Sequence, residues 1–163
     1  LAARADAHPF IEWPGARLQR QADLLVLHPA AQLAPAAAAA GAARELSWRW
    51  RKAPVRVLPA GLGEIELKDD ARGPLDLGAL AGTLIIRWRR GGERLAPVRG
   101  GPRRALKSLL QESRVPLALR ARLPLIYCGG RLVAVADLWL DASVQAGPAT
   151  QRRARLTWTD PVL

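Results

Sequence analysis

Several residue types that build active sites are scarce in this chain of 163 residues. It has one cysteine, Cys128, two histidines, His8 and His28, and no methionine. A lone cysteine excludes an internal disulfide and is typical of a reducing cytoplasm. Two histidines far apart in sequence form no cluster with metal-ligand spacing. We therefore expect no metal site and a cytoplasmic protein. Because position 1 is not methionine, we also expect a fragment of a longer protein.

Catalytic and membrane motifs are equally scarce. No spacing suggests a Ser/His/Asp or Cys/His set, and no phosphate-binding GxxxxGK[ST] loop occurs. Cys128 lies in an apolar run, so we interpret it as an inert buried thiol rather than a nucleophile. No apolar run approaches the roughly 20 residues that span a bilayer. The first residues lack the pattern of a signal peptide. We expect neither catalysis by this chain alone nor a membrane partner.

Acidic residues are few, and their shortage is uneven along the chain. The whole sequence has 25 Lys and Arg against 14 Asp and Glu, a formal charge of +11. Residues 1–82 hold ten basic and nine acidic residues, whereas residues 83–163 hold fifteen and five. This concentration predicts one basic surface and a polyanionic partner, for which nucleic acid is the commonest candidate. The alternative is a solvated surface with no bound polyanion.

The densest basic stretch is RWRRGGERLAPVRGGPRRALKSLL, residues 87–110. Pro102 suits the first position of a helix, so Arg103 and Arg104 would open it, where the helix dipole favours carboxylates. A polyanion lying across this segment would offset that conflict. Gly91 and Gly92 are expected to reverse the chain or to supply the positive φ of an anion-binding nest. The predicted RNA-binding residues are Arg87, Arg89, Arg90, Arg94, Arg99, Arg103, Arg104 and Lys107.

The predicted helix has two distinct sides. Leu106, Leu109 and Leu110 form an apolar stripe with i, i+3, i+4 spacing. At about 100° per residue, Arg103, Lys107 and Arg114 share an edge, with Glu112 on the far side. Glu93 is the one acid of the basic segment, and we favour a structural pairing with Arg90 or Arg94 over a role in orienting an arginine. A second short helix is expected between Pro116 and Pro124.

The remaining sequence favours short strands and turns. In residues 83–90, Leu84, Ile86 and Trp88 alternate with Ile85, Arg87 and Arg89, which predicts a strand with its arginines outward. Gly129-Gly130 is expected to be a two-residue hairpin loop. Trp88 and Trp158 fit the core, while Trp48 and Trp50 are left open between core and base stacking. Strands are predicted at 16–21, 24–27, 55–58, 63–67, 83–90, 125–128, 131–135, 138–140 and 152–159, which describes an α+β domain that is mostly β.

Several motifs from Thr83 to Trp158 occur together: RWRRGGERL, the helix RALKSLLQE, LPLIYCGGRLVAVADLWLD and the closing strand. In this order and spacing they resemble the C-terminal region of bacterial tRNA(Ile)-lysidine synthetase. WPGARLQRQADLLVL resembles, more loosely, the hairpin that precedes this region in the family. The chain departs from the usual family pattern at Ala96, Arg99, Ser108 and Gly130. The basic positions that match best are Arg87, Arg89, Arg90, Arg94, Arg104 and Lys107.

The resemblance implies the tRNA-binding part of an ATP-dependent carbon–nitrogen ligase. The family attaches lysine to the wobble cytidine of a CAU-anticodon isoleucine tRNA. Its ATP and Mg belong to an N-terminal PP-loop domain with an SGGxDS-type motif, which this sequence lacks. The resemblance therefore implies a chain that is inactive alone and holds no cofactor. Its implied partners are that tRNA and the PP-loop domain of the same protein; a homodimer is left open.

The same resemblance implies a domain organisation. Residues 1–46 would be the end of a preceding substrate-recognition domain, a β-hairpin plus an Ala-rich linker. Residues 47–163 would be the C-terminal tRNA-binding domain, β-sandwich-like with one or two short helices. The rival hypothesis is a generic RNA-binding or ribosome-associated module. A third is a freestanding enzyme acting on an anionic metabolite.

Overall fold

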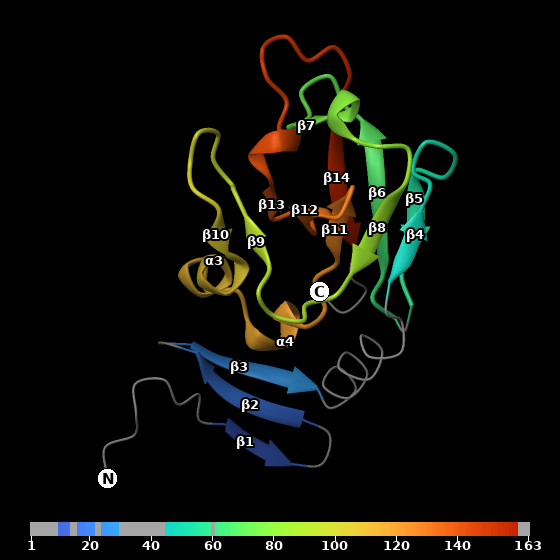
Figure 1. The fold of residues 1–163 in the computed structure, drawn as a ribbon. Helices are drawn as coiled ribbons and strands as arrows, with labels where there is room; N and C mark the ends of the chain where they lie inside the picture. Colours follow the sequence, from blue (N-terminus) through green and yellow to red (C-terminus); the bar gives the residue numbers. More distant parts are fainter. Residues whose placement is uncertain (1–9, 14–15, 22–23, 30–44, 60, 160–163) are drawn as a thin grey trace.

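The computed structural model describes residues 10–13, 16–21, 24–29, 45–59 and 61–159, and strands make up most of its regular structure (Figure 1). The first three, β1 (Phe10–Trp13), β2 (Ala16–Gln21) and β3 (Leu24–Pro29), form an antiparallel sheet in chain order. The predicted hairpin is confirmed as β2 and β3, and β1 is an additional strand. The predicted Ala-rich linker falls on residues 30–44, outside the described residues.

Two larger antiparallel sheets form the main part of the remaining fold. The first has the order β13-β12-β11-β8-β4 and the second β5-β6-β14-β7. The first sheet consists of β4 (Leu46–Trp48), β8 (Leu84–Arg87), β11 (Leu125–Cys128), β12 (Arg131–Val135) and β13 (Trp139–Leu140). The second consists of β5 (Val55–Val57), β6 (Glu64–Asp69), β7 (Leu75–Asp76) and β14 (Arg153–Thr159). Two short 3₁₀ helices, η1 (Leu77–Ala79) and η2 (Ala142–Val144), follow β7 and β13.

The two sheets face each other across one hydrophobic core. Leu84 and Ile86 of β8 are buried in the same cluster as Ile65 of β6 and Leu156 of β14. Alternation along each strand produces this arrangement, because every second side chain points to the same face. Each such side chain stabilises the fold by about 2 kcal/mol when fully buried. The prediction of an α+β, mostly β fold with a sandwich of sheets is confirmed.

The predicted pattern of strand 83–90 is confirmed, but the strand is shorter. Leu84, Ile86 and Trp88 are buried, whereas Arg87 and Arg89 are only partly buried. Ladder pairing ends at Arg87, where β8 faces Leu125 of β11. The following residues leave the sheet for the turn at Gly91 and Gly92.

The predicted helix begins four residues later than expected. Helix α3 spans Leu106–Glu112 with Ala105 as its N-cap, so Arg103 and Arg104 do not open it. Instead β10 (Arg104–Ala105) pairs with β9 (Arg94–Leu95). The conflict with the helix dipole is therefore absent, and the prediction of a polyanion on that ground was wrong. Backbone pairing with β9 makes Arg104 and Ala105 a strand. Pro102 alone could not indicate this pairing.

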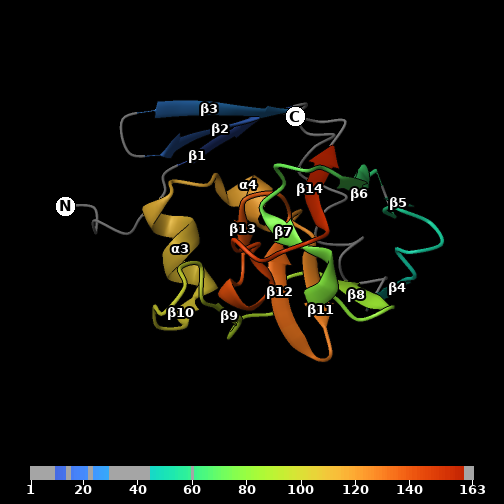
Figure 2. The ribbon, with the colours of Figure 1, turned by 90° about the horizontal axis from the view of Figure 1, so that it is seen from above.

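Helix α3 docks by its leucine stripe, as expected. Leu106, Leu109 and Leu110 are buried in a second cluster with Leu125 and Val135 of the first sheet. Figure 2, seen from above, shows α3 and β10 on one side of the molecule and β4 and β5 on the opposite side. The second predicted helix is confirmed as α4 (Leu117–Arg120). Within the described ranges, no helix is long and apolar enough to cross a membrane.

Trp48, Trp50 and Trp88 belong to the core rather than to an exposed stacking platform. Trp48, Trp50 and Trp88 are at least 94% buried, and Trp158 is half-buried against both clusters. The indole N–H groups of Trp48 and Trp50 donate to backbone carbonyls at 2.8 Å. These contacts hold the rings in place and leave their faces unavailable to bases.

Candidate nucleic-acid interface

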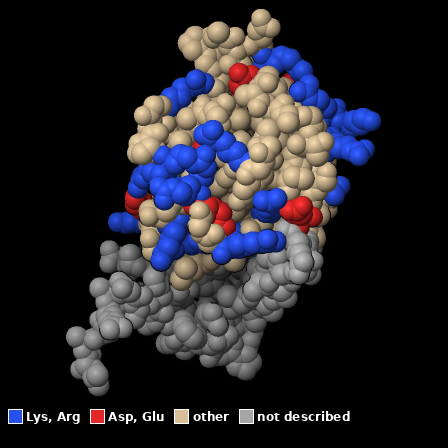
Figure 3. All heavy atoms as spheres, viewed as in Figure 1, with Lys and Arg blue, Asp and Glu red and all other residues tan. Residues whose placement is uncertain are grey.

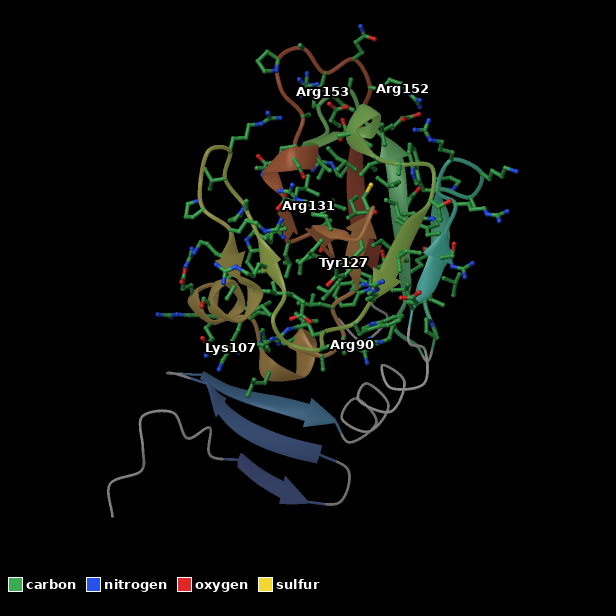
Figure 4. All side chains as sticks on the ribbon, viewed as in Figure 1. Arg90, Lys107, Tyr127, Arg131, Arg152 and Arg153 are labelled. Atoms are coloured by element: carbon green, nitrogen blue, oxygen red, sulfur yellow. The ribbon has the colours of Figure 1, made fainter. Side chains whose placement is uncertain are left out.

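A cavity of about 730 Å³ opens where the loop after β8, the β9–β10 hairpin and the β11–β12 turn meet. We call it the basic cavity. Figure 3 shows Lys and Arg side chains gathered on this face, and Figure 4 labels Arg90, Tyr127 and Arg131 around it. The charged residues of its described lining are Arg87, Arg90, Arg94, Arg103 and Arg131, with Glu93 as the one acid. The four glycines Gly91, Gly92, Gly129 and Gly130 complete much of its wall.

Arg94 and Arg103 hold the β9–β10 hairpin together by reciprocal hydrogen bonds. The guanidinium of Arg94 donates to the carbonyl of Arg103 at 2.6 Å, and that of Arg103 donates to the carbonyl of Arg94 at 2.7 Å. A carbonyl is neutral, so these bonds fix both guanidinium groups without cancelling their charge. Two cations are thus held at one wall of the cavity with donors left over for a ligand.

Arg87 is held more loosely at another wall. Two of its nitrogens lie 3.0 Å from the carboxylate of Glu45, and both side chains are partly exposed to solvent. Its guanidinium also lies over the ring of Tyr127, 4.8 Å from the centroid. Burial raises the pKa of Tyr127, as does the charge of Glu93, so the phenol remains neutral. An exposed ion pair contributes little, so Arg87 can exchange Glu45 for a phosphate.

The turn after β8 is filled by the protein's own carboxylate. Gly91 and Gly92 adopt φ of +96° and +82°, as predicted, and a Cβ at either would meet nothing within 4 Å. Glycine is therefore required here by conformation and not by space. The N–H groups of Arg90 and Gly91 donate to Glu93 Oε1 at 2.5 and 2.9 Å. The predicted anion-binding nest exists, but Glu93 occupies it.

Four predicted residues lie outside the cavity lining. Arg89 is mostly buried, and its Nε lies 4.0 Å from Glu93 Oε2. The guanidinium of Arg99 donates to the carbonyl of Gln145. Arg104 pairs with Glu112, which the helical projection had placed on the far side; Arg104 reaches it because it precedes the helix. Lys107 is exposed on α3, some way along the same face in Figure 4. Arg114, beyond the end of α3 with φ of +52°, does not continue the predicted helix edge.

Comparison with known proteins identifies the family to which this part of the chain is similar. Residues 84–158 match the model of the TilS substrate C-terminal domain, and every residue named in the cavity lining lies within that range. These residues form a TilS C-terminal domain. A crystal structure of a TilS C-terminal domain has the same fold, with a TM-score of 0.53 and 21% identity over 71% of this chain and 98% of that one.

Curated relatives of the TilS domain are named tRNA(Ile)-lysidine synthase. The protein of Ralstonia nicotianae is 38% identical over 147 residues, 90% of this chain and 32% of the relative. That of Pseudomonas aeruginosa is 45% identical over 82 residues, 50% of this chain and 17% of the relative. That of Coxiella burnetii is 30% identical over 135 residues, 83% of this chain and 28% of the relative. The chain thus spans about a third or less of these relatives.

Sequence reasoning missed two residues that shape the cavity of this TilS domain. Arg131 follows the Gly129-Gly130 turn, where the predicted hairpin loop is confirmed, and donates to Asp141 at 2.9 Å. The Asp141 carboxylate is fully buried and also accepts from Ala96 N–H and from the backbone and hydroxyl of Ser143. Burial alone would raise the pKa of Asp141, but these hydrogen bonds and Arg131 lower it. The turn could be predicted from the sequence, but nothing in the sequence indicated that Arg131 lines the same cavity as Gly91.

Proposed function

We propose that this chain is the tRNA-binding part of a tRNA(Ile)-lysidine synthase and that its basic cavity contacts the tRNA backbone. The parent enzyme would use ATP to ligate lysine to the wobble cytidine of a CAU-anticodon isoleucine tRNA in the cytoplasm. That chemistry, with its ATP and Mg, would belong to an N-terminal PP-loop domain. This chain alone would bind and position tRNA without catalysing the ligation. The names of the relatives support this proposal.

One structural observation carries the binding proposal: in its described lining the basic cavity has five arginines and one acid, and that acid faces backbone amides. Arginine binds phosphate with two parallel hydrogen bonds, which makes a fixed guanidinium an effective contact. Arg94 and Arg103 are fixed already, so little side-chain freedom is lost on binding. A-form RNA exposes phosphates and 2′-hydroxyls more readily than base edges. We therefore assign the cavity to backbone and shape recognition.

The other predicted residues extend this proposal. Arg99, Arg104 and Lys107 would meet the tRNA beside the cavity, along α3 and the β9–β10 hairpin. Arg104 would first have to leave Glu112, an exposed pair that is weak. Residues 47–163 would constitute the tRNA-binding domain and residues 1–46 the end of a preceding domain. A small misplacement of the reacting atoms lowers the reaction rate strongly. Binding of the tRNA far from the active site can therefore affect catalysis.

The salt dependence of binding tests the proposal. The purified chain would be titrated with an unmodified CAU isoleucine tRNA transcript at several salt concentrations, with binding followed by fluorescence anisotropy. With about six phosphates engaged, log K should fall by about 4 to 5 for each tenfold rise in salt. A flat response would contradict the proposed interface.

Competition between tRNAs then tests where discrimination lies. A CAU methionine tRNA shares the anticodon bases with the isoleucine tRNA, so it is a close competitor. Preference for the isoleucine tRNA by this chain alone would place part of the discrimination here. Equal binding of unrelated structured RNA would instead favour the generic RNA-binding module.

A further inference from the structure

The basic cavity contains an acid at a place where simple electrostatics disfavours it. Glu93 lines the same wall as Arg90 and Arg94, and a negative charge there repels an approaching phosphate. Its side chain is only 7% exposed. Burying a carboxylate is costly unless hydrogen bonds compensate. The arrangement therefore requires a reason beyond solvation.

The reason lies in the contacts of Glu93. Its Oε1 accepts from the N–H groups of Arg90 and Gly91, which closes the turn that follows β8. Its Oε2 lies 4.0 Å from Arg89 Nε. Its backbone carbonyl accepts from Leu106 N–H at 2.8 Å, at the first residue of α3. One residue thus joins the turn after β8, strand β9 and the start of α3.

This junction determines where several cations lie. Arg89 and Arg90 precede the turn, Arg94 follows it, and Lys107 stands next to Leu106 on α3. Gly91 and Gly92 have positive φ and no side chains to pack, and the Glu93 carboxylate accepts hydrogen bonds from the N–H groups of Arg90 and Gly91 within the same turn. Without the carboxylate, the Arg90 and Gly91 amides would lose their acceptor, and the turn would sample other conformations.

We propose that Glu93 is a positioning residue, which fixes the arginines of the basic cavity for RNA although its own charge opposes RNA binding. This inference rests on the proposed function, because it concerns the same tRNA interface. It differs from a charge argument in the sign of its prediction. Charge alone predicts that removal of Glu93 tightens binding, whereas positioning predicts that removal weakens it.

Three substitutions separate the two accounts. Glu93→Asp keeps the charge but shortens the side chain, so it cannot reach both amides. Glu93→Gln removes the charge but keeps an oxygen at the same position. Glu93→Ala removes both. Positioning therefore predicts weaker tRNA binding for Glu93→Asp and Glu93→Ala, by about tenfold, since two charge-assisted hydrogen bonds are lost. It predicts binding by Glu93→Gln within about threefold of the unchanged chain.

The experiment measures the affinity of the 163-residue chain for the CAU isoleucine tRNA transcript at fixed salt. Thermal unfolding by tryptophan fluorescence establishes which variants are folded at the assay temperature. If Glu93→Ala does not fold, the comparison of Glu93→Asp with Glu93→Gln still separates the two accounts. Aspartate keeps the charge, whereas glutamine keeps the position of the oxygen. Glu64→Gln and Glu64→Ala provide a matched control at an exposed acid of β6, outside the basic cavity.

The outcomes are distinct. Rescue by glutamine together with loss in aspartate supports positioning. Equal tightening in Glu93→Gln and Glu93→Ala, with no change in Glu93→Asp, overturns it and leaves a plain charge effect. If neither these variants nor Arg94→Glu alters affinity, the proposed tRNA interface itself is wrong.

Discussion

Two surfaces of the molecule carry arginine, but their counter-charges differ. The outer face of the β5-β6-β14-β7 sheet has Arg155 of β14 bonded to Asp70 at 2.9 Å. In addition, Arg152 lies 3.8 Å from Asp69, and Lys68 shares the outer face of β6 with Glu66 and Glu64. In the basic cavity, by contrast, Arg94 and Arg103 donate to carbonyls.

This comparison shows that the number of cations does not define a nucleic-acid surface. On the outer sheet face, carboxylates lie beside the basic groups and reduce their attraction for a polyanion. In the cavity, neutral carbonyls hold the guanidinium groups of Arg94 and Arg103, whereas Arg87 and Arg131 pair with the carboxylates of Glu45 and Asp141. Asp141 is buried beneath Arg131, and Glu93 faces backbone amides. Arg94 and Arg103 therefore keep more of their attraction for a polyanion than Arg155 does, although arginines occur on both surfaces.

The largest expected effect concerns the buried acid beneath the cavity. Asp141→Ala leaves the Ala96 N–H without its acceptor and Arg131 without its partner. We expect the free energy of unfolding to fall by about 3 kcal/mol, since a buried carboxylate that accepts hydrogen bonds from Ala96, Arg131 and Ser143 is removed. Urea denaturation measures it. Asp70→Ala, on the outer sheet face, is the matched control and should change stability little; equal losses at both positions would contradict the distinction between the two surfaces.

Charge reversal tests the comparison directly. Arg94→Glu should weaken binding of the CAU isoleucine tRNA at least about tenfold, because it places a repulsive charge in the cavity wall. Lys68→Glu makes the same change on the outer sheet face and should leave affinity within about twofold. Anisotropy titration measures both, with melting curves to confirm folding. Similar losses for the two variants would show that only total charge matters.

The sequence allowed much of the fold to be predicted because its signals were local. Alternation marked β8 and β14, glycine pairs marked two turns, and the leucine stripe marked the docking face of α3. The start of α3 could not be predicted, since pairing of Arg104–Ala105 with β9 depends on residues ten positions away. That long-range pairing overrode the proline signal.

The candidate site was predictable only as a segment. Arg87, Arg90, Arg94 and Arg103 line the cavity, but Arg89, Arg99, Arg104 and Lys107 lie outside its lining. Arg131 was missed because the register of β11 and β12, and the arrangement of two separate turns, bring it there. The role of Glu93 was also hidden. Sequence spacing suggested a partner among the arginine side chains, whereas Glu93 accepts hydrogen bonds from the N–H groups of Arg90 and Gly91.

A smaller effect on stability is expected from a glycine substitution in the turn that lines the cavity. Gly91→Ala forces an L side chain into positive φ and should destabilise the fold by about 1 kcal/mol. Gly82→Ala is a suitable comparison, because Gly82 is also exposed with free space around it but lacks positive φ. That control should be neutral or stabilising by about 0.5 kcal/mol through the unfolded chain. Thermal melts measure both; a stabilised Gly91→Ala would show that the turn is not held in its present conformation.

The smallest expected effect is a difference in acid response between the two surfaces. Because the pKa of Asp141 is lowered in the folded protein, the unfolded chain binds its proton first as pH falls. The stability that Asp141 provides is therefore complete above the ordinary carboxyl pKa of about 4 and is lost as pH drops through the lowered value. As the pH falls below about 4, the unfolding free energy should therefore decrease more in the unchanged chain than in Asp141→Asn.

The outer face offers the corresponding control. The pKa of Asp70 is also lowered, first by the Arg72 N–H and then by Arg155, so the sign of its pH dependence is the same. However, its contacts are open to solvent, where hydrogen bonds and ion pairs contribute less to stability. Asp70→Asn should therefore follow the unchanged chain closely as the pH falls below about 4. The opposite result would be a weaker pH dependence of unfolding free energy in Asp70→Asn and an unchanged one in Asp141→Asn. It would contradict the conclusion that Asp141 contributes more to stability than Asp70.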